Sequence, residues 1–394
     1  MKKNNIWIYD IESFSNFFSY YAINKKTKEE VFFYIHEDVN QINELRDHLQ
    51  FDVSHHIGFN CDSYDYPILH EILINDKIDY NAEEIYQISQ DVIKEDFSNI
   101  PSWLQKIHQI DVFLIKHYNN NARSTSLKWL EFTLRWDKLQ DLPYNHYDKI
   151  TKDQVENIKL YNRNDVLATK MFYENECLQD IQFRVQMSKK LNHNILNYSD
   201  VKIGEYLNRI TYEKLSGKNY KEFKNKRTYH KIFHLDDILP KNITFETDIF
   251  KEFYNTLKGK SFKPDEKLDR YIDLPNIRIK FAKGGLHSED IPVIIENTKG
   301  YLSELDIGSM YPWTIVSDNI YPNHLGPEWN NGIKNAFFHR ANVLKPKLKT
   351  LEKGTKEYNI IDSEQAAYKL AMNGGKRRNK TQLAYLISNY FIYL

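Results

Sequence analysis

Short aromatic and β-branched runs, separated by polar stretches, dominate the beginning of the chain. The strand-like runs are residues 6–9, 17–23 and 31–35. Because they follow one another closely, they predict a meander of three strands. The pattern then changes, since residues 39–49 and 67–73 show helical periodicity and residues 54–59 have the composition of a short strand. This alternation predicts a mixed α/β fold.

Later segments extend the mixed pattern. Residues 151–176 predict two helices, because Thr151 is a good N-cap and Asn164-Asp165 marks a junction between them. The chain becomes lysine-rich near residue 180, where we place a domain boundary. The remaining expected elements are a helix at 200–214, strands at 277–281 and 299–306 around a Gly284-Gly285 turn, and two helices within 328–375 joined by a loop at 352–359. We therefore expect an α/β and α+β multidomain protein.

The composition of the chain excludes several classes of protein. A length of 394 residues suggests two to three domains, and 41% hydrophobic residues suffice for buried cores. Having only Cys61 and Cys177 excludes a disulfide framework and a cysteine zinc site. No signal peptide is evident, and the apolar run 383–394 is shorter than the roughly 20 residues of a membrane helix. We expect a soluble, cytoplasmic protein that is not secreted and has no membrane partner.

The zero net charge of the chain is a cancellation between its two parts. Residues 1–180 carry 19 Lys and Arg against 30 Asp and Glu, a net charge of −11, whereas residues 181–394 carry 35 against 24, a net charge of +11. An acidic part suits carboxylates that bind metal, and a basic part suits phosphate. The alternative is two differently charged, solvated surfaces without these roles, which would give the same charge counts.

Three segments of the acidic part carry candidate chemistry. Asp10 and Glu12 follow the first strand-like run, and alternate side chains of a strand point to one face. Asn60 and Tyr64-Asp65 lie between an expected strand and helix. Tyr161 and Asp165 lie one helical turn apart. Four carboxylates of this kind could hold hard divalent cations.

In order and spacing, these segments resemble the three exonuclease motifs of family B DNA polymerases. The resemblance implies an RNase H-like 3′–5′ exonuclease domain in which two divalent cations, Mg²⁺ or Mn²⁺, hydrolyse phosphodiesters of DNA. The metal ligands it implies are Asp10, Glu12, Asp65 and Asp165. Tyr161 would orient the attacking water, and Asn60 would contact the single-stranded 3′ end. Asp62 is a rival for Asp65, whereas Asp111, which lies in a stretch that also resembles the family, is expected to be a surface acid.

A second set of residues resembles the polymerase site of the same family. Leu305–Pro312 resembles its first palm motif, which implies that Asp306 binds catalytic metal and that Ser309 and Tyr311 contact the incoming nucleotide. Gly284 and Gly285 resemble a DNA-binding loop of phage-type members. Lys369 and Asn373 resemble the start of the fingers motif, which binds the triphosphate of the dNTP. Residues 281–327 would then be palm and residues 328–375 fingers, after a connecting region at 181–280.

The resemblance stops at Gly375. The family carries paired aspartates in a second palm motif, but no Asp or Glu follows Glu364 here, and residues 376–394 form an atypical tail. We therefore expect the N-terminal portion of a phage-type family B polymerase, cut within the fingers motif, with an intact exonuclease and an incomplete polymerase site. Its partners would be a single-stranded 3′ end, primer-template DNA, dNTP with Mg²⁺ and, if the polymerase is split, a second chain. A viral protein of this kind would work in the host cytoplasm.

Two alternatives stay open. One is a stand-alone 3′–5′ DNA exonuclease whose basic part only binds DNA. Binding alone, however, would not require Asp306 followed by Ser309 and Tyr311. The other is a non-enzymatic subunit that binds DNA or a complementary polymerase fragment.

Overall fold

The computed structural model divides the chain into two compact units, Met1–Asp200 and Val201–Leu394. The first unit thus ends about 20 residues beyond the expected boundary at residue 180. The residues that the structure describes are 5–76, 78–95, 100–121, 124–145, 147–228, 231–238, 244–263, 266, 269–275, 277–282, 285–289 and 309–374, without the side chains of 285, 286, 311, 373 and 374. None of the described helices combines the length and apolarity that a membrane crossing needs.

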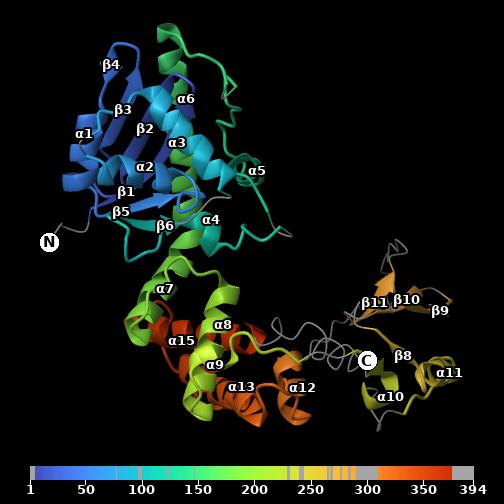
Figure 1. Cartoon of the computed structure of the whole chain (residues 1–394). Coiled ribbons are helices and arrows are strands. Elements are labelled where there is room, and N and C mark those ends of the chain that lie inside the picture. Colours follow the sequence, from blue (N-terminus) through green and yellow to red (C-terminus); the bar gives the residue numbers. More distant parts are fainter. Residues whose placement is uncertain are drawn as a thin grey trace. The chain divides into compact units, whose positions relative to one another are not determined.

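A mixed six-stranded sheet forms the centre of the first unit (Figure 1). Its strands are β1 (Ile6–Phe14), β2 (Phe17–Asn24), β3 (Glu30–His36), β4 (Val39–Asn40), β5 (His55–Gly58) and β6 (His108–Asp111), in the spatial order β4-β3-β2-β1-β5-β6. The first four pair antiparallel, so the expected meander of three strands is confirmed. Strands β5 and β6 continue the sheet in parallel with β1, so their carboxyl ends meet at one edge.

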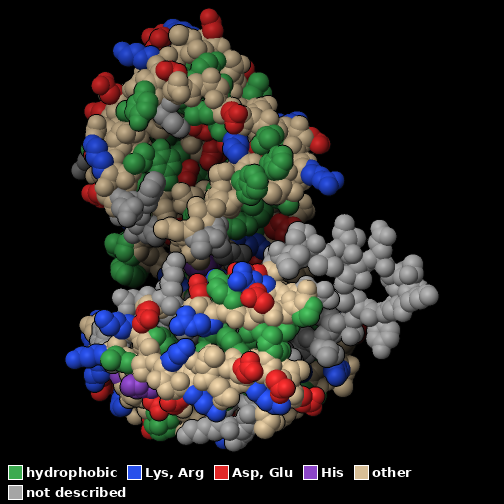
Figure 2. All heavy atoms as spheres, turned by 90° about the vertical axis from the view of Figure 1, so that its right-hand side faces the viewer, with side chains coloured by type: hydrophobic (Ala, Val, Ile, Leu, Met, Phe, Trp, Pro, Cys, Tyr) green, Lys and Arg blue, Asp and Glu red, His purple; other side chains and the backbone are tan. Residues whose placement is uncertain are grey.

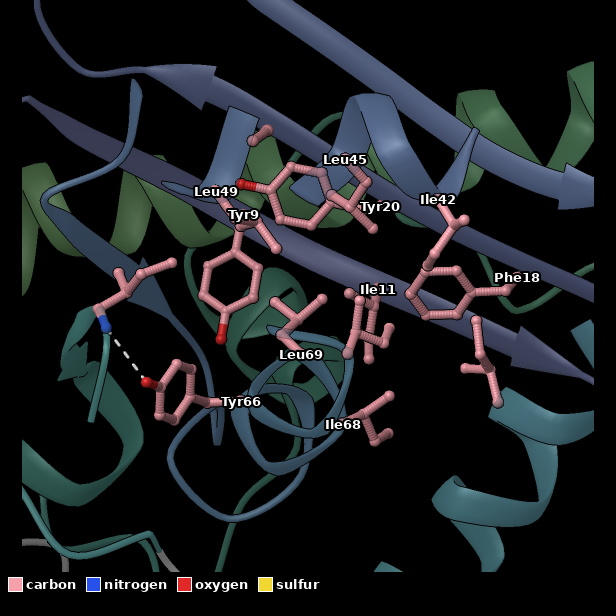
Figure 3. Close-up of a cluster of buried hydrophobic side chains, with 14 of the residues drawn as sticks. Tyr9, Ile11, Phe18, Tyr20, Ile42, Leu45, Leu49, Tyr66, Ile68 and Leu69 are labelled. Carbon is pink, nitrogen blue, oxygen red and sulfur yellow. Dashed lines mark hydrogen bonds between the residues drawn. The ribbon is translucent and has the colours of Figure 1, made fainter. Parts of the chain in front are cut away.

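Helices cover both faces of this sheet. The first unit contains α1 (Ile42–Asp47), α2 (Asp65–Ile74), α3 (Ala82–Lys94), α4 (Val112–Ile115), α5 (Leu127–Thr133), α6 (Val155–Phe172) and α7 (Leu178–Leu191). Tyr9 and Ile11 of β1 pack in a core with α1, α2 and α3, where Tyr66 Oη accepts the Ile107 N–H at 3.1 Å (Figure 3). Ile8 packs in a second core with residues of α6. Even-numbered side chains of β1 therefore face α6.

The expected break at Asn164-Asp165 is wrong, because α6 runs without interruption from Val155 to Phe172. The side chains of both residues are buried and make hydrogen bonds to other side chains, so they do not compete with the helix backbone. Asn164 Oδ1 accepts the Trp136 Nε1–H at 2.9 Å, and Asp165 Oδ1 accepts a hydrogen bond from Lys128 Nζ. A short π-helical turn, Tyr173–Cys177, then joins α6 to α7.

Other elements of the first unit also differ from expectation. The helix expected at 39–49 begins only at Ile42, since Val39–Asn40 pairs with β3, and a π-helical turn at His48–Asp52 follows it. The sequence analysis missed α3 and β6. Helix α3 begins with a capping box of Asn81 and Glu84, a signal that was available in the sequence. Strand β6 has only four residues, too few for a clear alternation.

The second unit has a helical part and a smaller part with strands. Its helices are α8 (Asp200–Ser216), α9 (Tyr220–Phe223), α10 (Leu235–Ile238), α11 (Asp248–Leu257), α12 (Met310–Ser317), α13 (Pro327–His339), α14 (Lys345–Lys349) and α15 (Lys356–Gly374). Its strands are β7 (Phe233–His234), β8 (Ser261–Phe262), β9 (Arg270–Leu274), β10 (Ile277–Ala282) and β11 (Gly285–Glu289). One core joins Tyr212 of α8 to residues of α12, α13 and α15, and another surrounds Phe281 of β10.

Several expectations for the second unit are confirmed. Helix α8 and strand β10 lie where they were expected, and α13 and α15 lie within the segment where two helices were expected. The loop expected at 352–359 ends earlier, because α15 begins at Lys356, and a π-helical turn (Arg340–Leu344) and α14 follow α13. Gly285 is the first residue of β11 and pairs with Ala282, the last residue of β10, so the chain reverses its direction where the turn was expected. Helix α12 was not expected. The strand expected at 299–306 lies outside the described residues.

Candidate active site

Three carboxylates meet between β1 and α6. Asp10 and Glu12 lie on the face of β1 that α6 covers, and Asp165 projects from α6 toward them. One oxygen from each carboxylate lies within 4.8 Å of the others. The inward-facing positions of α6 follow helical spacing, so Asp165 shares its face with Tyr161 and Asn162. The fold thus brings together three of the residues that the sequence analysis selected.

Asp65 lies near this cluster but is not one of the three whose oxygens converge. It is the first residue of α2 and is buried. Its negative charge raises the pKa of both Asp10 and Glu12, and its own carboxylate accepts hydrogen bonds from the backbone N–H groups of Asp65 and Ile11. Asp65 therefore acts on the cluster through its charge and through the backbone between Asp10 and Glu12.

Burial and mutual repulsion make this cluster unfavourable when every carboxylate is charged. Burial is the largest cause that raises the pKa of Asp10, Glu12 and Asp165, and the neighbouring carboxylates raise those of Asp10 and Glu12 further. Burial also raises the pKa of Asp65, to about 7. Such a group needs positive charge or hydrogen-bond donors to stay ionised at neutral pH.

Lys128 supplies one positive charge. Its Nζ lies 2.5 Å from Asp165 Oδ1 and 3.3 Å from Glu131 Oε1, and 4.5 Å from the centre of the Tyr161 ring. The ammonium lowers the pKa of Glu12 and of Asp165 against the effect of burial. The sequence analysis gave Lys128 and Glu131 no role, because only the folded chain brings α5 beside α6.

Asn162 and Tyr161 supply hydrogen bonds. Asn162 Nδ2 donates to Asp10 Oδ2 at 2.7 Å, which lowers the pKa of Asp10. Tyr161 hydrogen-bonds to Asp165, and burial together with the neighbouring carboxylates raises the pKa of its phenol. The phenol therefore stays protonated at neutral pH and can donate a proton in a hydrogen bond.

Asp111 is not the surface acid that was expected, because its side chain is fully buried. Its carboxylate accepts the backbone N–H groups of Asn60 at 3.1 Å and of Asp62 at 3.0 Å. It also caps α4 by accepting the N–H groups of Phe113 and Leu114. Asp111 thus ties the end of β6 to the loop that leads to α2.

This tie fixes the loop that carries Asn60. Asn60 has a left-handed backbone with φ of 59°, a conformation that Asn tolerates well. Asp62, the rival of Asp65, accepts a hydrogen bond from Gln105 Nε2 at 2.9 Å and is not among the three converging carboxylates. Asn60 therefore has a fixed position at the carboxyl end of β5, five residues before Asp65 in the sequence.

The residues expected at a polymerase site stay predictions. Asp306 and Gly284 lie outside the described residues, and nothing is described of the side chains of Tyr311 and Asn373. Ser309 is the N-cap of α12, with a left-handed φ of 60°. Lys369 is exposed on α15, the helix that also contains Asn373.

The donor set of the first unit fits a hard divalent cation. Asp10, Glu12 and Asp165 offer only carboxylate oxygens, the ligands that Mg²⁺ and Mn²⁺ prefer. Within the described part of the chain, Glu131 Oε2 and Asn162 Oδ1 are buried without a hydrogen-bond partner. Figure 2 shows acidic side chains inside a hollow of the first unit, with hydrophobic side chains around it. A cation bound here would relieve the repulsion between the carboxylates.

Comparison with known proteins agrees with this arrangement at the level of the fold. No protein-family model matches the sequence, and neither does any curated protein. The chain is similar to the solved structure of the family B DNA polymerase from the hyperthermophilic archaeon Pyrobaculum calidifontis, with a TM-score of 0.52 and 13% sequence identity. The match covers 99% of this chain and 50% of that one, so this chain spans about half the length of the polymerase. The similarity shows a shared mixed α/β, multidomain fold.

Proposed function

We propose that the first unit is a two-metal 3′–5′ exonuclease that removes nucleotides from single-stranded DNA. The observation that carries this proposal is the convergence of Asp10, Glu12 and Asp165 within 4.8 Å in a partly buried site. The strand order of the sheet, with an antiparallel meander extended by two parallel strands, supports an RNase H-like domain. Fold alone does not establish activity, so the proposal rests on the site.

Each residue then has a stated role. Asp10, Glu12 and Asp165 hold the cations, and Asp65 completes the negative charge around them. Two such cations would activate water and stabilise the leaving 3′ oxygen of the scissile phosphodiester. Tyr161 orients the attacking water through its phenol group, and Asn162 favours the ionised form of Asp10 and holds it in place. Asn60, held by Asp111, contacts the terminal nucleotide.

Lys128 has a role that follows from its position. Its ammonium neutralises Asp165 when no cation is bound, and it is available to a phosphate oxygen at the same site. Hydrolysis releases a nucleoside 5′-monophosphate and leaves a strand shortened by one nucleotide with a free 3′-hydroxyl.

We further propose that the chain is the N-terminal part of a phage-type family B DNA polymerase and that the exonuclease proofreads. Support comes from the likeness in fold to a polymerase of that family and from the motif around Asp306, Ser309 and Tyr311. Lys369 and Asn373 would bind dNTP, and Gly284 and Gly285 would contact DNA. No Asp or Glu follows Glu364, so these 394 residues alone would not synthesise DNA.

The test is an exonuclease assay on the full chain with and without Asp10→Ala plus Glu12→Ala. We expect Mg²⁺- or Mn²⁺-dependent degradation by the parent chain and none by the double variant. Undiminished activity in the variant would refute the site. A parallel primer-extension assay tests the proposal that the polymerase site is incomplete. Template-directed incorporation of dNTP by this chain would contradict that proposal.

A further inference from the structure

Two histidines lie side by side at the amino ends of β5 and β6. His55 is the first residue of β5, His108 is the first residue of β6, and the two are partners in the parallel register of these strands. Partners in such a register point to the same face of the sheet. On this face, Ile57 and Ile110 belong to the core that α6 shares. We call His55 and His108 the histidine pair.

The two rings of the pair have the separation that a shared metal ion requires. Their centroids lie 5.2 Å apart, and their planes are inclined by 43°. In a tetrahedral site with metal–nitrogen distances of about 2.0–2.1 Å, the centroids of two ligating imidazole rings lie about 5 Å apart. The paired strands thus already hold the rings at a chelating distance, which reduces the free energy lost in ordering them when an ion binds.

Hydrogen bonds determine which nitrogen of His55 carries the proton. The single hydroxyl proton of Ser54 is donated to the carbonyl oxygen of Asn5 at 2.7 Å, so Ser54 Oγ accepts from its other partners. His55 Nδ1 lies 3.1 Å from Ser54 Oγ and therefore donates to it. A proton on Nδ1 leaves a lone pair on Nε2. Histidines that ligate metal have this arrangement, in which the second nitrogen donates to a fixed partner.

The environment of the pair also favours a neutral ring that is open to solvent. Burial and the neighbouring His108 both lower the pKa of His55, so its imidazole is neutral at neutral pH. His55 is half-buried and His108 is exposed, so an ion can reach the pair from solvent. Among the residues that the structure describes, no third His, Cys, Asp or Glu side chain completes the site, which leaves the other coordination positions to water.

We propose that the histidine pair binds one Zn²⁺ ion and so clamps the amino ends of β5 and β6 together. Imidazole nitrogen suits Zn²⁺, Ni²⁺ and Cu²⁺, whereas Mg²⁺ prefers oxygen ligands. The pair is therefore separate from the carboxylate cluster in its chemistry, and it does not depend on the exonuclease function. The clamp acts on the two strands whose carboxyl ends lead to Asn60 and to Asp111.

The test is a calorimetric titration of the full chain with Zn²⁺. The background carries Asp10→Ala plus Glu12→Ala, which removes two of the three converging carboxylates. The added variants are His55→Gln, His108→Gln and both together, and His287→Gln, at an exposed histidine of β11, is the control. Melting temperatures without metal show that each variant folds. Electron paramagnetic resonance with Cu²⁺ in place of Zn²⁺ counts the imidazole nitrogens bound to the ion.

We expect His287→Gln to bind Zn²⁺ like the background chain, and either single substitution in the pair to weaken binding at least about tenfold. The double substitution should weaken it little further, because chelation needs both rings. Cu²⁺ should show coupling to two imidazole nitrogens in the background chain and lose it in His108→Gln. Zn²⁺ should also raise the melting temperature of the background chain more than that of His108→Gln.

Two results would overturn the clamp. One is the absence of Zn²⁺ binding by the background chain, and the other is binding that His108→Gln leaves unchanged. Because His108 is exposed, this variant tests the proposal even if His55→Gln fails to fold. Neither result bears on the carboxylate cluster, since the background already lacks Asp10 and Glu12.

Discussion

At the scale of single residues, the candidate site depends on the balance between clustered negative charge and the few groups that offset it. Asp10, Glu12 and Asp165 converge, and Asp65 adds its charge. Among the described side chains, Lys128, Tyr161, Asn162 and Asn164 are seen to lower the pKa of one or more of these carboxylates, and of these four only Lys128 carries a positive charge. Protons or cations must supply the rest. This requirement makes the site sensitive to pH and to divalent metal.

The first prediction concerns pH. Asp65 has a pKa of about 7 in the folded chain, against an ordinary value of 3.8, so the folded state binds its proton more tightly than the unfolded state does. This contribution to stability is fully present below about pH 4 and is lost as the pH rises to about 7. In EDTA, the melting temperature should therefore be higher at pH 5 than at pH 8.

The control for this prediction is Asp65→Asn, which should flatten the dependence of the melting temperature on pH. Divalent cations should flatten it as well, because they stabilise the ionised form. A melting temperature that rises from pH 5 to pH 8 in EDTA would contradict the charge balance described for the site.

The second prediction concerns Lys128. Replacing it by Met removes the ammonium from Asp165 and Glu131 and should lower the stability of the metal-free chain by about 1–3 kcal/mol. Mn²⁺ should restore more stability to this variant than to the parent, since the carboxylates then lack their internal cation. Thermal unfolding with EDTA and with Mn²⁺ measures both effects. Lys159→Met, at a more exposed lysine of α6, is the control, and an equal response of the two variants would count against the role of Lys128.

At the scale of elements, one buried carboxylate organises the edge where β5 and β6 end. Asp111 accepts backbone N–H groups of Asn60 and Asp62 on one side and of Phe113 and Leu114 on the other. Gly58 contributes by its lack of a side chain, because a Cβ there would lie 2.6 Å from Cys61 Cβ. The loop that carries Asn60 and leads to Asp65 is therefore fixed by packing and by hydrogen bonds.

The third prediction tests this edge. Asp111→Ala leaves four backbone N–H groups without their acceptor and should destabilise the chain by about 3 kcal/mol or more. Exonuclease activity should fall as well, because Asn60 and Asp65 lose their fixed positions. Thermal unfolding and an exonuclease assay measure the two effects. Asp137→Ala, at an exposed aspartate, should change neither, and an equally mild effect of Asp111→Ala would exclude the proposed tie.

Much of the element pattern could be predicted from the sequence. Strands β1 to β3 lie where aromatic and β-branched runs predicted them, and helix α8 also lies where it was expected. The prediction failed where polar residues of the site interrupt the hydrophobic pattern, or where an element is too short to show one. In α6 several inward positions are polar, so Asn164 and Asp165 suggested a break within a continuous helix. Strand β6 is short, and its last residue is the buried Asp111, which a hydrophobic pattern does not reveal.

At the scale of the whole molecule, the opposite charges of the two parts of the chain match their proposed roles. The acidic part holds the carboxylates that converge in the first unit, and the basic part contains exposed lysines such as Lys345, Lys347 and Lys349 on α14. The resemblance of their segments to known exonuclease motifs could select Asp10, Glu12 and Asp165 from the sequence. Lys128 and Glu131 could not be found in this way, because their roles depend on which helices lie side by side.

The fourth and most direct measurement is the product ladder that the full chain makes from a 5′-labelled single-stranded oligonucleotide. With Mg²⁺ or Mn²⁺, labelled products should shorten one nucleotide at a time from the 3′ end, and EDTA or Asp165→Asn should stop the reaction. Internal cuts, release of the 5′ label as a mononucleotide at the start, or an unchanged ladder with Asp165→Asn would contradict the assignment of this site as a 3′–5′ exonuclease.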